Sequence, residues 1–342
     1  MSKLKCGIVG CGGIAQVHGH ALSLQESAQL LAFADIKPER AQAMAARFGG
    51  HAYNSLEAML EAERLDVLHI CTPHSLHLPM AQKAAKQGVH VFTEKPPVIS
   101  SQQWEEFQAL DQLVQVGICF QNRYNPSVAF CRELLAEGGP GKILGARAFV
   151  TWRREAPYYT ESGWRGQLDT EGGGALINQA IHTLDLMVRF MGRHLSVGAN
   201  MDNHHLPGII QVEDTLEAAV EFQGGRGLFF ASTAYCQDAP ILLELACENC
   251  TLRIEGEEVT QRWRDGKVVR QDFSAQGQGP GKAYWGSSHG RCIADFYRCL
   301  QTGQAFLNSI AGVADTVELM LDIYAAAQSG GVVRSGDEAL QM

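Results

Sequence analysis

The sequence predicts an α/β protein with a parallel sheet in its N-terminal half and a mainly antiparallel, open-faced sheet in its C-terminal half. In the first half, short apolar runs alternate with helical patterns, which predicts a parallel sheet joined by right-handed crossovers. A glycine-rich turn follows the first apolar run. In the second half, strand-like runs follow one another across short glycine-containing turns, which predicts antiparallel hairpins.

The composition indicates two domains of an ordinary globular protein. A chain of 342 residues exceeds one typical core, and a polar, turn-forming stretch begins at Gln121. We therefore predict a dinucleotide-binding domain over residues 1–121 and a substrate-binding and oligomerisation domain over residues 122–342. With 46% hydrophobic and 19% charged residues, the chain is typical of soluble proteins with a large core.

Charge and patterning argue against several classes of partner. The formal net charge is −9 and no Lys/Arg cluster is present, so nucleic acid is not expected. No apolar run reaches the roughly 18 residues of a membrane helix, and the first residues lead into a strand rather than a signal peptide. We expect a cytoplasmic protein that acts on a small molecule, with its ten scattered cysteines reduced.

The glycine-rich turn has the spacing of a dinucleotide-binding loop. It follows a strand over residues 5–9 and opens a helix to residue 24, with the sequence Gly10-Cys11-Gly12-Gly13-Ile14-Ala15. Glycines let the backbone approach a pyrophosphate, and Ala15 lets the helix pack close to the sheet. This strand, turn and helix predict a Rossmann domain in which Gly10, Gly12, Gly13 and Ile14 contact the cofactor. The alternative is a glycine turn that binds nothing.

The next strand, residues 29–35, indicates which cofactor is bound. It ends at Asp35, about 20 residues after the glycines, where a carboxylate can accept both ribose hydroxyls of NAD. The same charge would repel the 2′-phosphate of NADP, so NAD is predicted. Lys37 and Arg40 lie close by in the sequence and keep NADP possible.

Two later strands of the first half end in candidate site residues. Residues 67–71 lead into Thr72 and Pro73, and residues 89–93 lead into Glu94 and Lys95. Parallel strands end at one edge of the sheet, where open α/β sheets bind ligands. A partly desolvated lysine there can have a lowered pKa and exchange protons near neutral pH, although a surface lysine is the alternative.

The sequence predicts no metal site. His74 and His77 have i, i+3 spacing, but no second Cys/His pair flanks them. We interpret them as packing at a helix start or as contacts to the cofactor. Cys247 and Cys250 form a lone C-x-x-C between two strand-like runs and are interpreted as a turn.

The second half contains a loop and a helix that suit a sugar-like substrate. Residues 153–174 are rich in Tyr, Trp, Arg and Gly without clear periodicity, which indicates a functional loop or a structural loop anchored by Trp164. A helix over residues 175–191 then places Asn178, His182 and Asp185 on one polar face. His182 is the candidate acid/base of this half, and a satisfied core histidine is the alternative.

Strand patterns and two helices complete the chain. The strands are expected at residues 196–201, 215–222, 228–234, 241–246 and 251–255, with shorter pieces near Val259 and Val268, and the helices at 289–302 and 310–329. The helix over residues 175–191 would cover one face of the sheet. A second copy of the protein would cover the other.

Five motifs follow one another along the chain: the glycine turn at 10–15, Thr72 to His77, Glu94-Lys95-Pro96, Trp164-Arg165-Gly166 and the stretch 172–185. With this ordered set, the chain resembles the glucose-fructose oxidoreductase, inositol 2-dehydrogenase and rhizopine-catabolism (Gfo/Idh/MocA) family over nearly the full length. The resemblance implies a homodimer or homotetramer formed through the C-terminal sheet.

The resemblance also implies roles for single residues. Lys95 and His182 match the catalytic pair of the family, with Lys95 also close to the cofactor. The nicotinamide end would be lined by Thr72, Pro73, His77 and Glu94, and the substrate would be bordered by Arg123, Trp164 and Arg165. One position departs from the pattern: several members carry an aspartate four residues before the histidine, where this chain has Asn178. An amide cannot take a proton, but it can hydrogen-bond a substrate hydroxyl or Lys95.

These observations lead to one hypothesis and two alternatives. The hypothesis is an NAD(P)-dependent oxidoreductase that transfers hydride between nicotinamide and a secondary alcohol of a sugar, cyclitol or sugar derivative. One alternative is a cofactor-bound regulator without catalytic activity. The other is an NAD-dependent glycosidase that uses transient oxidation of its substrate.

Overall fold

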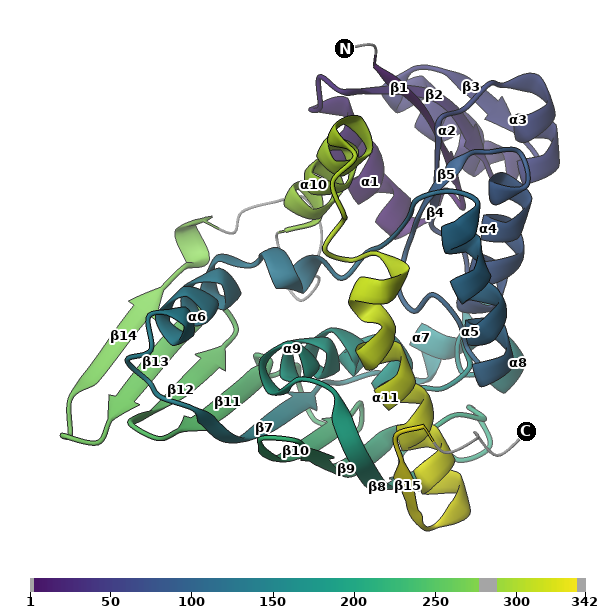
Figure 1. Ribbon diagram of the computed structural model, residues 1–342. Helices are drawn as coiled ribbons and strands as arrows, with labels where there is room; N and C mark the ends of the chain where they lie inside the picture. The colour runs from purple at the N-terminus through teal and green to yellow at the C-terminus, as the bar shows by residue number, and fades with distance from the viewer. Residues whose placement is uncertain (1–2, 277–287, 337–342) are drawn as a thin grey trace. The chain divides into compact units, whose positions relative to one another are not determined.

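The structure is a computed structural model that describes residues 3–276 and 288–336 (Figure 1). Its contacts divide these residues into two compact units, 3–121 with 288–313, and 122–276 with 314–336. The sequence placed 288–313 in the second domain, whereas the contacts place this segment in the first unit. The reason is packing: Tyr297 lies 3.0 Å from the His69 ring, and Phe296 packs against Phe92 with ring centroids 5.2 Å apart.

The first unit contains a parallel sheet of six strands in the order β3-β2-β1-β4-β5-β6. The strands are β1 Leu4–Val9, β2 Ala28–Ala34, β3 His51–Tyr53, β4 Val67–Ile70, β5 His90–Thr93 and β6 Val116–Ile118. This order reverses between β1 and β4, which is where doubly wound sheets bind dinucleotides. The predicted Rossmann fold is confirmed.

Helices cover both faces of this sheet. They are α1 Gly13–Ser23, α2 Pro38–Phe48, α3 Leu56–Ala62, α4 His77–Ala85, α5 Ser101–Gln108 and α10 His289–Thr302. In Figure 1, α1 and α10 lie on one side of the strands and α4 and α5 on the other. Serine residues cap the N-termini of α3 and α5. The Ser55 hydroxyl accepts a hydrogen bond from Ala58 N at 3.1 Å, and the Ser100 hydroxyl accepts one from Gln103 N at 3.2 Å.

The second unit is built on a sheet of nine strands in the order β14-β13-β12-β11-β7-β10-β9-β8-β15. The strands are β7 Ile143–Thr151, β8 His194–Asp202, β9 Thr215–Phe222, β10 Gly225–Ser232, β11 Leu242–Cys247, β12 Cys250–Glu255, β13 Glu258–Trp263, β14 Val268–Asp272 and β15 Val332–Arg334. All neighbours pair antiparallel except β7 and β10. The predicted, mainly antiparallel sheet is therefore confirmed, and β15 is an edge strand that the sequence pattern did not indicate.

One face of this sheet is covered by helices. Figure 1 shows α6 Pro126–Ala136 and α9 Ile181–Met191 lying over it. The last helix, α11 Ile310–Ser329, belongs to this unit from residue 314 onward. Along β7, Ala148 and Val150 are buried while Arg147 and Phe149 are exposed, so one face of the strand packs against helices and the other does not.

The predicted helix over residues 175–191 is two elements, because its first turn is wound differently. Residues Ala175–Ala180 form a π-helix, and the α-helix α9 begins only at Ile181. The buried Glu213 carboxylate accepts from Gly174 N at 2.8 Å and from Leu176 N at 3.0 Å. The Tyr324 hydroxyl accepts from Ile177 N at 3.3 Å. Glu213 and Tyr324 thus accept hydrogen bonds from backbone amides that have no acceptor within the π-helix.

The loop before this π-helix also has regular pieces. Within residues 153–174, which the sequence left without periodicity, lie two short helices, α7 Ala156–Thr160 and α8 Leu168–Glu171. All ten cysteines, each within the described residues, are free thiols. Among the described residues, no helix is long and apolar enough to cross a membrane.

We expect Gly174→Ala to destabilise the second unit. A Cβ at this position would lie 1.9 Å from the Glu213 carbonyl oxygen, a backbone atom that cannot move aside alone. The expected cost is about 3 kcal/mol, seen as a lower midpoint in thermal or urea unfolding. Gly139→Ala is the control, because its nearest neighbour would be Trp263 at 3.5 Å, and it should stay within about 0.5 kcal/mol of the wild type. Equal midpoints for both variants would contradict this account.

Candidate functional site

The glycine turn of the first unit has the geometry of a phosphate-binding loop. Gly10 has φ +83°, and a Cβ there would lie 2.6 Å from the Cys71 carbonyl oxygen, so both conformation and space require glycine. Gly12 precedes α1 without a side-chain cap, and a Cβ there would meet no neighbour within 4 Å. The first amides of α1 therefore remain for an anion at the positive end of the helix, which fits a dinucleotide pyrophosphate.

Asp35 lies directly beside this turn. Its carboxylate accepts from Cys11 N at 2.7 Å and from Lys37 N at 2.8 Å, and its side chain is largely buried. An acidic group at the carboxyl end of β2 fits the ribose of NAD. The glycines and Asp35 together thus fit the dinucleotide that the sequence predicted, while their individual contacts to it stay predictions.

His77 ties together two of the strand ends predicted to line the cofactor. Its Nδ1 lies 2.6 Å from the Pro96 carbonyl oxygen and its Nε2 lies 2.9 Å from the Thr72 carbonyl oxygen. Burial lowers the pKa of the ring, and the two carbonyls oppose that shift. With both nitrogens facing backbone carbonyls, His77 positions the segments after β4 and β5 rather than binding a metal with His74.

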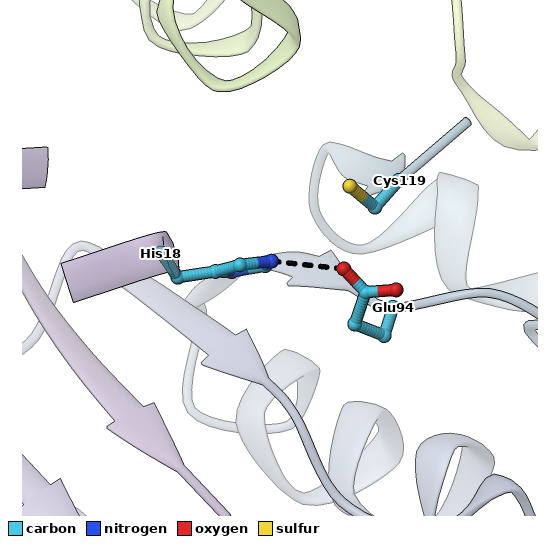
Figure 2. Close-up of side chains that lie close together, drawn as sticks. All are labelled: His18, Glu94 and Cys119. Atoms are coloured by element: carbon cyan, nitrogen blue, oxygen red, sulfur yellow. Dashed lines mark hydrogen bonds and ion pairs between the residues drawn. The ribbon is translucent and has the colours of Figure 1, made fainter. Parts of the chain in front are cut away.

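Glu94 ends a chain of buried hydrogen bonds. Its Oε1 lies 2.9 Å from His18 Nε2, shown as a dashed line in Figure 2. The His18 Nδ1 lies 3.0 Å from His69 Nδ1, and the His69 Nε2 lies 3.0 Å from the Tyr297 hydroxyl. One arrangement of protons satisfies every atom: Tyr297 donates to His69, His69 to His18, and His18 to an ionised Glu94.

Electrostatics agrees with this arrangement. Burial lowers the pKa of His69 well below its ordinary value, so its ring is neutral at neutral pH. Burial is the largest single influence and would raise the pKa of Glu94, but the hydrogen bond from His18 and the charges of His18, His289 and Lys95 together outweigh it, so the pKa lies below its usual range. Glu94 is therefore an ionised carboxylate held in the interior beside Lys95, the candidate catalytic residue, whose amide lies 3.4 Å from Glu94 Oε2.

The same carboxylate belongs to a group that could geometrically hold a metal. One ligand atom from each of His18, Glu94 and Cys119 lies within 4.8 Å of the others (Figure 2). Binding a metal through His18 Nε2 would remove the proton that it donates to Glu94, and burial raises the pKa of the Cys119 thiol well above its usual value. We assign this cluster to positioning, not to metal binding.

In the second unit, the aromatic loop forms a layer of stacked side chains. The Arg165 guanidinium lies over the rings of Tyr158 and Trp164, with its carbon 4.5 Å and 4.8 Å from their centroids. The Tyr158 hydroxyl lies 2.8 Å from Gln179 Nε2 and 3.5 Å from Asn178 Nδ2. The structure thus places Arg165 and Asn178, both predicted to face the substrate, against Tyr158, and the predicted residue Trp164 against Arg165.

Glu171 joins this group and was not predicted. Its carboxylate is buried and accepts hydrogen bonds from Gly166 N and from Asn178 Nδ2. Burial is the largest influence and raises the pKa of Glu171 to about 7, although the two hydrogen bonds and the Arg165 charge lower it. An acid directly before three glycines is the signal that could have indicated this residue.

The predicted polar face of the helix is split. Asn178 lies in the π-helix and His182, half-buried, in the first turn of α9. Asp185, however, is fully buried and does not share a solvent-facing surface with them. It accepts from Arg123 Nε at 2.8 Å, from a second Arg123 nitrogen, and from Thr316 Oγ1 at 2.7 Å.

This ion pair bears on the role predicted for Arg123. Its guanidinium is buried, with 5% of the residue exposed, and is bound by Asp185 in a two-point contact. The contact anchors the short helix turn after residue 121 to α9, and a role of Arg123 at the substrate stays a prediction. Lys95 belongs to the first unit and His182 to the second, and their meeting at one substrate also stays a prediction.

Comparisons with known proteins identify both halves of the chain. Residues 4–117 match the model of an oxidoreductase family with an NAD-binding Rossmann fold, and residues 128–258 match the GFO/IDH/MocA C-terminal domain. A D-glucoside 3-dehydrogenase of Escherichia coli is 27% identical over 252 residues, covering 68% of this chain and 71% of that protein. A 2,7-anhydro-N-acetylneuraminate hydratase of Mediterraneibacter gnavus is 24% identical over 91% of this chain and 93% of its own.

The fold comparison agrees with the sequence comparison. The crystal structure of the WlbA dehydrogenase from Bordetella pertussis, in complex with NADH and UDP-GlcNAcA, superposes with a TM-score of 0.84 and 26% identity. It covers 97% of this chain and 98% of that one.

We expect His18→Leu to destabilise the first unit more at high pH than at low pH. In the wild type, Glu94 has a lower pKa in the folded than in the unfolded protein. Its ionised form therefore stabilises the fold at pH values above the unfolded-state pKa of this residue, and this stabilisation is lost only in acid. Without the donor, burial raises that pKa, so stability falls as pH rises. The deficit should be about 3–5 kcal/mol near pH 8 and shrink toward pH 5, measured by thermal unfolding. Adding Glu94→Gln should abolish this pH dependence; a deficit that is constant with pH would contradict the assignment.

Proposed function

We infer the activity of this chain from its family: it belongs to the GFO/IDH/MocA oxidoreductases, whose N-terminal domain is an NAD-binding Rossmann fold. It is an NAD-dependent dehydrogenase acting on CH–OH groups, as the sequence predicted. We propose that its substrate is a sugar, cyclitol or sugar derivative with a secondary alcohol. One observation carries this proposal. Glu94-Lys95-Pro96 follows a strand of the Rossmann sheet, and His182 lies on a helix of the second unit, as the sequence predicted for both.

The proposal assigns complementary tasks to Lys95 and His182. When bound, NAD supplies the hydride acceptor or donor. His182 takes the proton of the substrate hydroxyl, and Lys95 stabilises the negative charge that develops on that oxygen. The chain of buried hydrogen bonds that ends at Glu94 holds the backbone from which Lys95 projects. His77 fixes the neighbouring strand end through the Thr72 and Pro96 carbonyls.

Relatives support a sugar-like substrate. The E. coli relative is a D-glucoside 3-dehydrogenase, and the structure with 26% identity binds NADH and UDP-GlcNAcA. The layer of Trp164, Arg165 and Tyr158 offers aromatic faces and donors that suit a ring with several hydroxyls. We propose that this layer borders the substrate, and that the protein acts in the cytoplasm, where its thiols stay reduced.

We expect Lys95→Ala and His182→Ala each to lower turnover by about 10²–10⁴-fold, because a proton-transfer or charge-stabilising group is lost. NAD affinity should change by only a modest factor. The assay follows NADH formation with inositols, aldoses and sugar nucleotides, with NAD and NADP in parallel, and titration of the cofactor is the control. Wild-type turnover in either variant would refute its role. Tight NAD binding without turnover of any polyol would instead favour a regulator.

A second function is favoured by the hydratase of M. gnavus, which matches 91% of this chain. In this alternative, hydride is removed from the substrate and returned within one turnover, and elimination or hydrolysis occurs in between. Such an enzyme would co-purify with its cofactor and consume substrate without net change in NADH absorbance. Stoichiometric NADH formation would exclude this alternative.

We propose that the uncovered face of the second sheet binds a second copy of the chain. On β7 and β10, Phe149 and Phe230 pack with ring centroids 6.1 Å apart, and Leu228 is 59% exposed. Arg147 of β7 and Glu244 of the neighbouring strand β11 form an ion pair at 2.8 Å. An apolar centre with a paired charge beside it is typical of a self-complementary interface, either in a homodimer or in a homotetramer.

We expect Leu228→Glu to dissociate this oligomer, because symmetry would place the new charge in the centre of the interface from both sides. Sedimentation should show a smaller species for the variant than for the wild type. Val268→Glu, an exposed apolar residue on the edge strand β14, is the control and should leave the mass unchanged. A wild-type chain that sediments as a monomer would contradict the proposal.

A further inference from the structure

The Asn178 side chain is held by its nitrogen. Its Nδ2 donates to Glu171 Oε1 and lies 3.5 Å from the Tyr158 hydroxyl. An ionised carboxylate can only accept hydrogen bonds, so it requires the NH₂ end of the amide to face it. The amide oxygen of Asn178, an acceptor, consequently lies at the opposite end from Glu171.

The backbone around Asn178 is fixed independently of Glu171. Asn178 N donates to Gly174 O at 3.1 Å, and Glu213 and Tyr324 hold the neighbouring amides of the π-helix. Glu171 therefore does not set the backbone position of Asn178, but it does set the orientation of the side-chain amide. His182 follows four residues later, at the start of α9, so this orientation is set within one turn of the proposed base.

Resting on the proposed function, we propose that Glu171 is a positioning residue that sets the substrate specificity of the site through Asn178. It orients the amide so that the Asn178 oxygen accepts a hydrogen bond from a hydroxyl of the substrate next to the reacting carbon. In the resemblance described above, several family members carry an aspartate at this position. Here the negative charge lies seven residues earlier in the chain, on Glu171, and only a neutral acceptor is presented to the substrate.

Protonation of Glu171 would release this orientation. A protonated carboxyl can donate, so it could bind the amide oxygen instead of the amide nitrogen. Burial raises the pKa of Glu171 to about 7, which places this change near neutral pH. The titratable groups that act on Glu171 from neighbouring elements are Arg165 of the loop, Glu213 before β9, Tyr158 and Tyr159 of α7, and Tyr324 of α11.

The test exchanges the acid and the amide between the two positions. In Glu171→Gln, residue 171 can accept only one of the two hydrogen bonds from Gly166 N and Asn178, so we expect KM for the polyol to rise about 10-fold with little change in kcat. In Asn178→Asp, a second carboxylate faces the buried Glu171, and kcat/KM should fall about 10-fold or more. The double variant restores a donor and an acceptor across the contact and should recover to within about 3-fold of the wild type.

The pH profile separates positioning from a structural role. In the wild type, the acidic limb of log kcat/KM should be steeper than a slope of 1 over about one pH unit, because protonation of Glu171 adds a loss of about 10-fold to the loss of His182 as the proposed base. In Glu171→Gln the slope should be about 1. Glu161→Gln removes an exposed acid from the same loop and is the matched control, with KM and slope unchanged.

The outcomes distinguish this inference from the proposed function. A wild-type enzyme without polyol turnover would overturn both. An active wild type with the same KM and the same slope in Glu171→Gln would overturn only the role of Glu171. The role of Glu171 would also be overturned if the double variant had the same kcat/KM as Asn178→Asp, because the two positions would then not be coupled.

Discussion

A buried carboxylate needs hydrogen-bond donors, and this requirement organises both units around their candidate site residues. Glu94 is satisfied by His18, whose ring is oriented in turn by His69 and Tyr297. In the second unit, Glu213 is satisfied by the amides of Gly174 and Leu176. Losing a donor to a buried charge costs more than losing an ordinary contact, so each carboxylate fixes its surroundings strongly.

In the first unit, the result is a rigid sheet edge. Glu94 fixes the end of β5, and His77 connects the chain after β5 to the chain after β4 through two carbonyl oxygens. Residues that bind a cofactor must hold their geometry without the cofactor's help, since ordering them on binding would weaken affinity.

In the second unit, carboxylates shape the segment that carries Asn178 and His182. Glu213 and Tyr324 favour a π-helical turn, and the close approach of Glu213 O explains why position 174 is glycine. Glu171 then orients the side chain of Asn178. A π-turn places side chains at angles that a regular helix cannot, which is why such turns are common at functional sites.

The sequence by itself determined the two folds and supplied the candidate residues for the site. Glycine spacing, Asp35 and the alternation of strands and helices are local signals, and they predicted the parallel sheet, the NAD cofactor and the position of Lys95 at a strand end. The antiparallel strands followed from hairpin turns in the same way. These features depend on residues that are neighbours in the chain, so they can be recognised from the sequence alone.

Only the tertiary structure decided which partners the polar residues take. His69 and Tyr297 are separated by 228 positions, and Asn178 and Tyr158 by 20, so no local pattern links them. The same holds for α10, which joins the first unit through Tyr297 and Phe296, and for Asp185, whose helical position indicated exposure but whose partner Arg123 buries it. Hydrogen bonding and burial are settled by what lies nearby in space, and the order of residues along the chain does not contain that information in a readable form.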